Sequence, residues 1–143
     1  MKRKLLAVLT LLMVLILAVT GCGSESDNDT QTKTPDAEGG EKLRVAMVLP
    51  GLKTDEAFNQ YTYEGMLRAK EELGIEIAYR EEVAQDEQVE VIRQFAQQGY
   101  DIIIGQGGQF GEALKTVAQE FPDKHFVFSV ATETYGLPNL TAA

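Results

Sequence analysis

The sequence predicts one α/β domain built on an open, mostly parallel β-sheet with helices on both faces. From Leu43 onward, short runs of β-branched and aliphatic residues alternate with longer segments of helical periodicity, as expected of repeated strand–helix units. The most apolar of the short runs, residues 102–104, is three consecutive isoleucines, which is typical of a central strand covered on both faces. This order predicts a three-layer, doubly wound fold.

The first strand is predicted over residues 43–49, with Pro50 and Gly51 ending it. A helix is predicted over residues 57–73, because Gly74 follows as the glycine common just past a helix end. The three- and four-residue steps of this helix predict that one face contains Phe58, Thr62, Gly65, Ala69 and Leu73. A second short strand is expected over residues 75–79.

The second helix is predicted to start at a cap formed by Asp86 and to end at Gly99. Its apolar stripe is Val89, Ile92, Phe95 and Ala96. After the strand at residues 102–104, a third helix is predicted to end at Pro122, and its stripe is Phe110, Ala113, Leu114, Val117, Ala118 and Phe121. A fourth strand is expected over residues 125–130 and a fifth near residues 139–142.

Composition excludes several classes of function. The chain has 143 residues, of which 13 are Lys or Arg and 22 are Asp or Glu, so its net charge is −9. This acidic balance argues against nucleic-acid binding, which needs cations that neutralise phosphates. One Cys and one His exclude a disulfide framework, a cysteine zinc cluster and a histidine-rich metal site. No metal or cofactor is therefore predicted.

Residues 1–21 are predicted to be an export signal peptide. Lys2, Arg3 and Lys4 precede a largely apolar run over residues 5–19, which is short for a membrane-spanning helix. The alternative is an N-terminal anchor that is never cleaved. Residues 22–42 are predicted to form a flexible tether, because no large apolar side chain occurs after Cys22 in this segment.

The four residues Val19-Thr20-Gly21-Cys22 resemble the lipobox of bacterial lipoproteins. This resemblance implies cleavage before Cys22 and attachment of diacylglycerol to its sulfur. Lipidation would account for a lone cysteine in an exported chain. The expected location is the extracytoplasmic face of the cell membrane, where the acyl chains hold an otherwise soluble domain.

Three loops follow the predicted strands at the sheet edge where open parallel sheets bind ligands. The first offers Asp55, Phe58 and Asn59, which suit hydrogen bonding and ring stacking. The alternative is that Asp55 caps the helix and Phe58 packs in the core. The third loop offers Ser129, Thr132 and Glu133, and its alternative is an ordinary polar loop.

The second loop, residues 105–110, is rich in glycine but does not match a dinucleotide-binding fingerprint, because Phe110 stands where the third glycine is required. It indicates a close backbone approach to a ligand or a tight turn. The sequence shows no Ser/His/Asp arrangement, paired carboxylates or metal-ligand spacing. His125 is expected to be a partly exposed structural residue at the start of a strand.

Three separated motifs occur in order along the chain. They are Val48-Leu49-Pro50-Gly51-Leu52 with Asp55-Glu56-Ala57-Phe58-Asn59-Gln60 and Tyr63-Glu64-Gly65, then residues 98–105, then residues 117–123. Together these motifs resemble the basic membrane protein (BMP) family over residues 43–143. The resemblance implies the first lobe of a type I periplasmic-binding-protein fold. It also implies a substrate-binding lipoprotein of an ABC importer, a family whose characterised members bind purine nucleosides or related purines.

The resemblance also implies roles for individual residues. Asp55, Phe58 and Asn59 match the family's D-x-x-F-N ligand segment, so Phe58 would stack on a base while Asp55 and Asn59 form hydrogen bonds. The glycine–aromatic turn is matched by Gly107, Gly108 and Phe110. The complete set of predicted ligand-binding residues is Asp55, Phe58, Asn59, Gln106, Gly107, Gly108, Phe110, Ser129 and Thr132.

The sequence departs from the family pattern at two places. Pro50 stands where many members have Asp, and Ser129-Val130 stands where others have Ile-Asp, which favours a free base or another small ligand over a ribose-bearing one. Residues 43–143 account for one lobe of the two that such binding proteins contain, so the chain is expected to be a truncated form.

The leading hypothesis is a non-catalytic solute-binding lipoprotein of an ABC importer. Its predicted partners are a small purine-type ligand, the permease subunits and the membrane through Cys22, with no nucleic acid. An alternative is a lipid-anchored sensor domain that signals a bound ligand to a membrane partner. A surface-anchored hydrolase is the least supported, because no nucleophile and base are apparent.

Overall fold

The structure is a computed structural model that describes residues 41–143. The predicted signal peptide, Cys22 and nearly all of the tether lie outside the described residues. The elements follow the order β1 (Arg44–Val48), α2 (Phe58–Leu73), β2 (Glu76–Arg80), α3 (Gln88–Gln97), β3 (Ile102–Gln106), the 3₁₀ turn η1 (Gly108–Phe110), α4 (Gly111–Glu120), β4 (His125–Ser129) and β5 (Leu140–Ala142).

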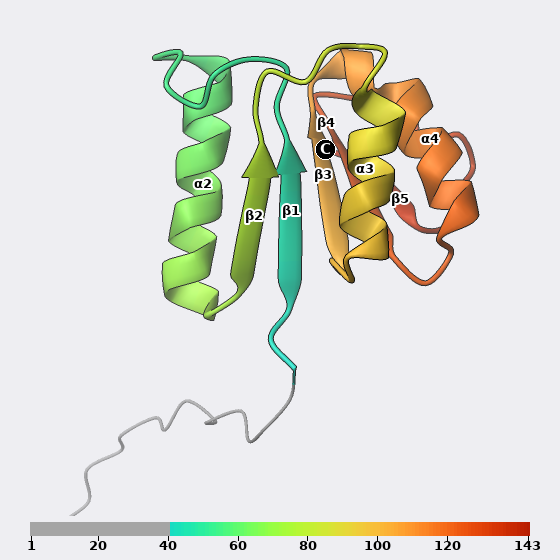
Figure 1. Cartoon of the computed structure of the whole chain (residues 1–143), viewed down its shortest axis with the longest axis horizontal. Helices are drawn as coiled ribbons and strands as arrows, with labels where there is room; N and C mark the ends of the chain where they lie inside the picture. The colour runs from blue at the N-terminus through green and yellow to red at the C-terminus, as the bar shows by residue number, and fades with distance from the viewer. Residues whose placement is uncertain (1–40) are drawn as a thin grey trace, which may run out of the picture. The chain divides into compact units, whose positions relative to one another are not determined.

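The five strands form one parallel sheet in the order β2-β1-β3-β4-β5. The chain moves from β1 outward to β2 and then returns to β3 on the other side of β1, so the strand order reverses between β1 and β3. Helix α2 lies on one side of the sheet, whereas α3 and α4 lie on the other (Figure 1). The predicted three-layer, doubly wound α/β fold is confirmed, including the fifth strand.

Strand β1 is buried on both faces. Val45 and Met47 pack with Met66 of α2, while Ala46 and Val48 belong to the larger cluster beneath α3 and α4. Such an apolar strand without polar alternation is what burial in the middle of three layers requires. The amino-acid pattern of β1 therefore accounts for its central position.

The burial of β3 differs from the prediction. Ile103 is fully buried under α3 and α4, but Ile102 and Ile104 are only partly buried on the side that α2 covers. The reason is the number of helices on each side, because α2 is the single described helix on its side of the sheet. The run of three isoleucines correctly predicted a central strand, but the expected burial on both faces holds fully only for the face with Ile103.

The predicted helix over residues 57–73 is confirmed, but the face defined by its three- and four-residue steps is buried only in its middle, where Thr62, Gly65 and Ala69 are partly buried. Phe58 and Leu73 are 42% and 72% exposed, whereas Asn59 and Met66 are the buried residues of the helix. Adjacent helical residues point about 100° apart, so the helix is rotated by roughly one residue relative to the predicted face. A buried polar residue gives no hydrophobic signal, so the apolar spacing of α2 does not indicate that Asn59 faces inward.

The predicted cap of the second helix is likewise wrong. α3 begins at Gln88, its preceding residue Glu87 has helical dihedral angles, and no side chain caps it. Asp86 is exposed. The predicted apolar stripe is confirmed, because Ile92 and Ala96 are buried in the core cluster and Val89 and Phe95 pack against it. Among the described residues, no helix has the length and apolarity needed to span a membrane.

Candidate functional site

The candidate site lies at the carboxyl edge of the sheet, where the strand order reverses between β1 and β3. The loop after β1 leads into α2, and the loop after β3 leads through η1 into α4. In doubly wound folds the loops on either side of such a reversal diverge and leave a crevice. The first two predicted ligand segments meet at this point of the fold.

Asp55 organises the start of α2. Its Oδ1 accepts hydrogen bonds from the N–H groups of Ala57 (3.0 Å) and Gln60 (3.1 Å), and its Oδ2 accepts from the N–H of Asn59 (3.1 Å). The side-chain amide of Asn59 donates to the same Oδ2 over 2.8 Å. These bonds satisfy N–H groups that a helix leaves free in its first turn.

The carboxyl group of Asp55 is used within the protein. Loss of hydration opposes its charge and would raise the pKa, but the hydrogen bonds from Asn59, Ala57 and Gln60 outweigh that effect and hold the pKa below its ordinary value. Four donors occupy the two oxygens, and a carboxylate offers about four lone-pair positions. The capping alternative raised for Asp55 therefore describes its geometry.

Phe58 is the first residue of α2, and its ring is not in the core. At 42% exposure, it is one of the few large apolar side chains open to solvent. A methyl group placed on Gly107 would lie 3.4 Å from Phe58 Cε1, so the ring lies beside the loop after β3. The core alternative for Phe58 is wrong, and part of its aromatic ring is open to solvent at the carboxyl edge of the sheet.

Asn59 carries a buried acceptor. Its side chain is 6% exposed, and its Nδ2 donates to Asp55. Its Oδ1 is buried and has no hydrogen-bond donor among the described residues. An unpaired buried carbonyl oxygen is costly, because it has lost water without gaining another donor. The site therefore contains an acceptor that a donor from outside these residues would satisfy.

Gln106 ends β3 and is 2% exposed. Its Nε2 donates to Thr62 Oγ1 over 2.6 Å and to the carbonyl oxygen of Phe58 over 3.3 Å. Its Oε1 accepts from the hydroxyl of Ser129 over 2.6 Å. Thr62 in turn donates to the Phe58 carbonyl oxygen over 3.0 Å. One amide thus connects β3, β4 and the first turn of α2.

The glycines after β3 have distinct roles. Gly107 has φ 106° and ψ 157°, a combination that side-chain-bearing residues avoid, and its N–H donates to Ser129 Oγ over 3.1 Å. Gly108 is exposed and has open space where a side chain would be. Phe110 is fully buried, so its ring presents no surface at this edge. Thr132 is exposed in the loop after β4.

The sequence did not reveal one contact that holds the first loop. Glu81, just after β2, accepts from the N–H of Lys53 and from its Nζ, each over 2.9 Å. Those bonds lower the pKa of Glu81 below its ordinary value. Lys53 also lies 4.9 Å from the centroid of the Tyr79 ring. Because β1 and β2 are neighbouring parallel strands, the loops after them lie close together. A lysine after β1 and a glutamate after β2 are therefore the sequence feature that could have indicated this pair.

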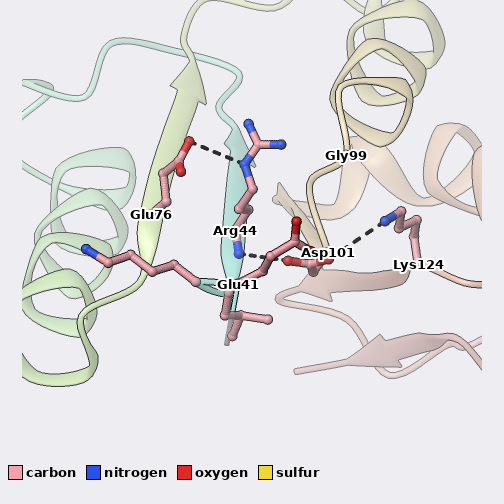
Figure 2. A pocket seen from close by; sticks show the side chains of 8 residues that line it. Glu41, Arg44, Glu76, Gly99, Asp101 and Lys124 are labelled. Atoms are coloured by element: carbon pink, nitrogen blue, oxygen red, sulfur yellow. Dashed lines mark hydrogen bonds and ion pairs between the residues drawn. The ribbon is translucent and has the colours of Figure 1, made fainter. Parts of the chain in front are cut away.

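A hollow of about 860 Å³ lies at the opposite, amino edge of the sheet. Figure 2 shows two ion pairs among its charged side chains: Arg44 with Glu76 over 3.3 Å, and Lys124 with Asp101 over 3.7 Å. The backbone N–H of Arg44 also donates to Asp101. These paired charges stabilise the strand starts, and the hollow is not at the edge where parallel sheets bind ligands.

The chemistry available at the carboxyl edge is that of recognition. It comprises an exposed aromatic face, a buried amide oxygen, a glycine backbone and hydroxyl groups. Among the described residues there is no group of three or more His, Cys, Asp or Glu side chains that could hold a metal ion. His125, the start of β4, is exposed at the amino edge of the sheet.

Comparison with known proteins gives a family and several relatives. The Bmp family model, described as ABC transporter substrate-binding protein PnrA-like, matches residues 42–142. An uncharacterized lipoprotein of Pyrococcus furiosus is 34% identical over 95 residues, which are 65% of this chain and 24% of the relative. The transcriptional activator protein med of Bacillus subtilis is 27% identical over 93 residues, which are 64% of this chain and 29% of that protein.

Solved structures agree with these matches. An ABC transporter solute-binding protein from Conexibacter woesei is 34% identical, with a TM-score of 0.64 over 70% of this chain and 34% of that chain. A lipoprotein fragment from Peptoclostridium difficile shares the fold at 24% identity, with a TM-score of 0.64 over 71% of this chain and 84% of the fragment. The chain spans about a quarter of the length of the curated relatives it matches.

Proposed function

The chain belongs to the Bmp family of PnrA-like ABC transporter substrate-binding proteins, and from that premise we propose that it binds a purine base or purine nucleoside for an ABC importer. The observation that carries this proposal is the exposed ring of Phe58 beside Gly107 at the reversal of strand order. A flat heteroaromatic ligand gains stacking energy on such a ring.

The polar groups around Phe58 suit the edge of a purine. Asn59 Oδ1 would accept a hydrogen bond from a ring or exocyclic N–H after a small rotation of its side chain, which its orphaned state favours. Gly108 and Thr132 offer a backbone N–H and a hydroxyl from the loops after β3 and β4, whereas the hydroxyl of Ser129, at the end of β4, already donates to Gln106 and accepts from the N–H of Gly107. In this proposal Asp55, Gln106 and Phe110 support the site from within the protein.

The charge of the site favours an uncharged ligand. Glu56 and Glu82 are exposed in the loops after β1 and β2, and Lys53 is already paired with Glu81 over 2.9 Å. A phosphorylated ligand would meet these carboxylates without a matching cation from the first loop. A base or nucleoside avoids that repulsion, whereas a nucleotide does not.

The proposal includes the location and partners of the protein. Relatives named as lipoproteins and the lipobox at residues 19–22 support an acyl anchor on Cys22. An anchor of this kind would hold the domain outside the cell, near permease subunits that receive the ligand. A substrate-binding role of this kind requires no catalytic residue in the chain.

Calorimetric titration of the purified chain with adenosine, guanosine, inosine and hypoxanthine tests the proposal. We expect Phe58→Ala to weaken binding about 5- to 150-fold, because stacking on an aromatic residue is worth about 1–3 kcal/mol per base. Thermal stability should change little, because the ring is largely outside the core. Tyr61→Ala is the matched control, since Tyr61 is an aromatic residue of α2 with 68% exposure.

Two results would count against the purine proposal. Equal weakening by Phe58→Ala and Tyr61→Ala would show that the Phe58 ring has no special contact. A large loss of stability in Phe58→Ala without a change in binding would show that its ring has a packing role instead. Titration with AMP should give no binding if the carboxylates repel phosphate.

A second candidate function is a lipid-anchored ligand sensor. The observation that favours it is the match to a Bacillus subtilis protein named as a transcriptional activator. Both functions use the same ligand site, so binding alone does not separate them. Deletion of the gene should abolish uptake of labelled purine if the chain serves an importer, whereas intact uptake with an altered transcriptional response to purines would favour the sensor.

A further inference from the structure

The helix that carries Phe58 has few apolar contacts to hold it. Of its 16 residues only Asn59 and Met66 are buried, and the core on this side contains four buried side chains, Val45, Met47, Leu49 and Met66. Phe58 itself is 42% exposed. Apolar packing therefore does not fix the position of the Phe58 ring, and polar contacts must contribute.

Gln106 supplies such contacts from the sheet. Its amide reaches the first turn of α2 at two points, the Phe58 carbonyl oxygen and Thr62 Oγ1, and is itself oriented by Ser129 of β4. Ser129 Oγ also accepts from the N–H of Gly107, the residue beside the Phe58 ring. The same network thus fixes both the backbone of Phe58 and the loop against which its ring lies.

We propose that Gln106 is a positioning residue, which holds the Phe58 ring beside Gly107 in the orientation that binds ligand and does not touch the ligand itself. At 2% exposure its side chain offers no surface to a bound molecule. Its amide nitrogen and oxygen are both used by protein groups. This inference rests on the proposed function, because it assigns Phe58 to the ligand.

Replacement of Gln106 by methionine isolates this role. Methionine is unbranched and of similar length, so it fills the same space without hydrogen bonding. The partners of Gln106 are not left unpaired, because Thr62 still donates to the Phe58 carbonyl oxygen over 3.0 Å, and the hydroxyl of Ser129 can turn to the Gly105 carbonyl oxygen, which lies 3.1 Å from Oγ. Gln106→Met is therefore expected to fold while losing the link between sheet and helix.

The sequence contains no tryptophan, so Phe58→Trp in the full chain places a single tryptophan at the site. Its steady-state fluorescence anisotropy reports how freely the ring at position 58 rotates, and it needs no ligand. We expect Gln106→Met in this background to lower the anisotropy toward that of a freely rotating surface tryptophan. Thr62→Val and Ser129→Ala, which remove the neighbouring links, should lower it in the same direction.

Asn139→Leu in the same background is the matched control. Asn139 is another buried amide, and its Nδ2 donates to the carbonyl oxygens of Ala118, Phe121 and Lys124. It lies just before β5, at the amino edge of the sheet. Its loss should lower thermal stability at least as much as Gln106→Met does, yet leave the anisotropy at position 58 unchanged.

Two results would overturn the proposal. Unchanged anisotropy in a folded Gln106→Met variant would show that the amide does not position the ring. An equal loss of anisotropy in Asn139→Leu would show that general loosening is the cause. If Gln106→Met fails to fold, Thr62→Val and Ser129→Ala decide by the same criterion, and unchanged anisotropy in both would overturn it.

Quenching of the same tryptophan by adenosine separates this inference from the proposed function. If adenosine quenches, Gln106→Met should weaken its apparent affinity about two- to tenfold, which is the net effect of one typical intramolecular hydrogen bond among the three that the variant loses. Asn139→Leu should not weaken it. If none of the purines quenches while Gln106→Met still lowers the anisotropy, purine binding fails but the positioning of residue 58 stands.

Discussion

Gly107 shows how a single residue determines the shape of the site. Its φ of 106° and ψ of 157° are accessible essentially to glycine alone. A methyl group there would also meet Gln109 Oε1 at 2.6 Å and Phe58 Cε1 at 3.4 Å. The turn after β3 therefore requires glycine for its backbone, and the absence of a side chain lets the Phe58 ring approach.

Gly107→Ala should lower the free energy of unfolding by about 1–3 kcal/mol, the usual cost of a backbone held in a sparsely populated region. Gly108→Ala is the control, because Gly108 has no positive φ and has open space around it. Chemical denaturation of both variants measures the difference. Equal stability of the two would contradict the assignment of strain to Gly107.

Local sequence also explains which site features could be predicted. The Asp55–Asn59 segment is visible as spacing, because Asp55 forms its contacts within a few residues, with Ala57, Asn59 and Gln60. The glycine-rich segment after β3 is visible as composition, although the contact of Gly107 with Ser129 spans 22 positions. The links from Gln106 to Thr62 and from Lys53 to Glu81 span 44 and 28 positions. Whether these residues meet depends on the order of the strands in the sheet, and residue spacing along the sequence does not determine that order.

At the scale of elements, strand identity followed from composition and helix orientation did not. Four of the predicted strands begin within one residue of the observed ones, and the fifth was expected near residues 139–142, where β5 begins at Leu140. The apolar spacing of α2 does not identify its buried side, because the two buried residues are Asn59 and Met66. A buried polar residue such as Asn59 gives no hydrophobic signal. The third helix begins as the 3₁₀ turn η1 because the chain must leave β3 through glycines.

Helix α2 is predicted to be the least protected of the described α-helices. It buries two of its 16 residues, whereas α4 buries five of its 10: Gly111, Ala113, Leu114, Val117 and Ala118. Local opening is easiest where few apolar groups are buried. Hydrogen–deuterium exchange should therefore be faster for peptides of α2 than for those of α4, and equal exchange would contradict this ranking.

Met66 is the main apolar anchor of α2, since it packs with Val45, Met47 and Leu49. Met66→Ala should cost about 2–5 kcal/mol of unfolding free energy, as for other buried large-to-small changes. Leu73→Ala is the matched control on the same helix, because Leu73 is 72% exposed. Thermal denaturation compares the two, and a similar loss in both would show that α2 is not held through Met66.

At the scale of the whole molecule, three carboxyl groups make stability depend on pH. The pKa of Asp55 is lowered because hydrogen bonds from the start of α2 outweigh its loss of hydration, and the pKa of Glu81 is lowered by hydrogen bonds from Lys53. The pKa of Glu120 is lowered chiefly by its hydrogen bonds from Arg93, which join α3 to α4. The three groups lie in different parts of the domain.

A carboxyl group whose pKa is lower in the folded state contributes stability that is fully present above its unfolded value, about 4. That contribution is lost as pH falls through the lowered folded value. The melting temperature should thus change little between about pH 7 and pH 5 and fall below about pH 4. Glu81→Gln with Glu120→Gln should flatten this dependence, and an unaltered profile would assign the acid sensitivity to other groups.

Membrane attachment is a property of the whole chain, and Cys22 is the residue on which it is predicted to depend. The chain contains a single cysteine, so Cys22 is the one residue to which an acyl-bearing group could be attached through sulfur. Two acyl chains on that residue would give stable attachment, whereas a single chain gives marginal binding. Residues 22–42, without large apolar side chains after Cys22, would then separate the domain from the bilayer surface.

Intact-mass measurement of protein extracted from its native membranes tests this attachment. The wild-type chain should lack residues 1–21 and carry diacylglycerol on Cys22, and its membrane association should withstand high salt because acyl insertion does not depend on charge. Cys22→Ala should carry no lipid and should leave the membrane fraction. Two results together would instead assign attachment to an uncleaved apolar segment at residues 5–19. They are an unmodified mass of 15.7 kDa for the membrane-bound protein and retention of Cys22→Ala in the membrane fraction.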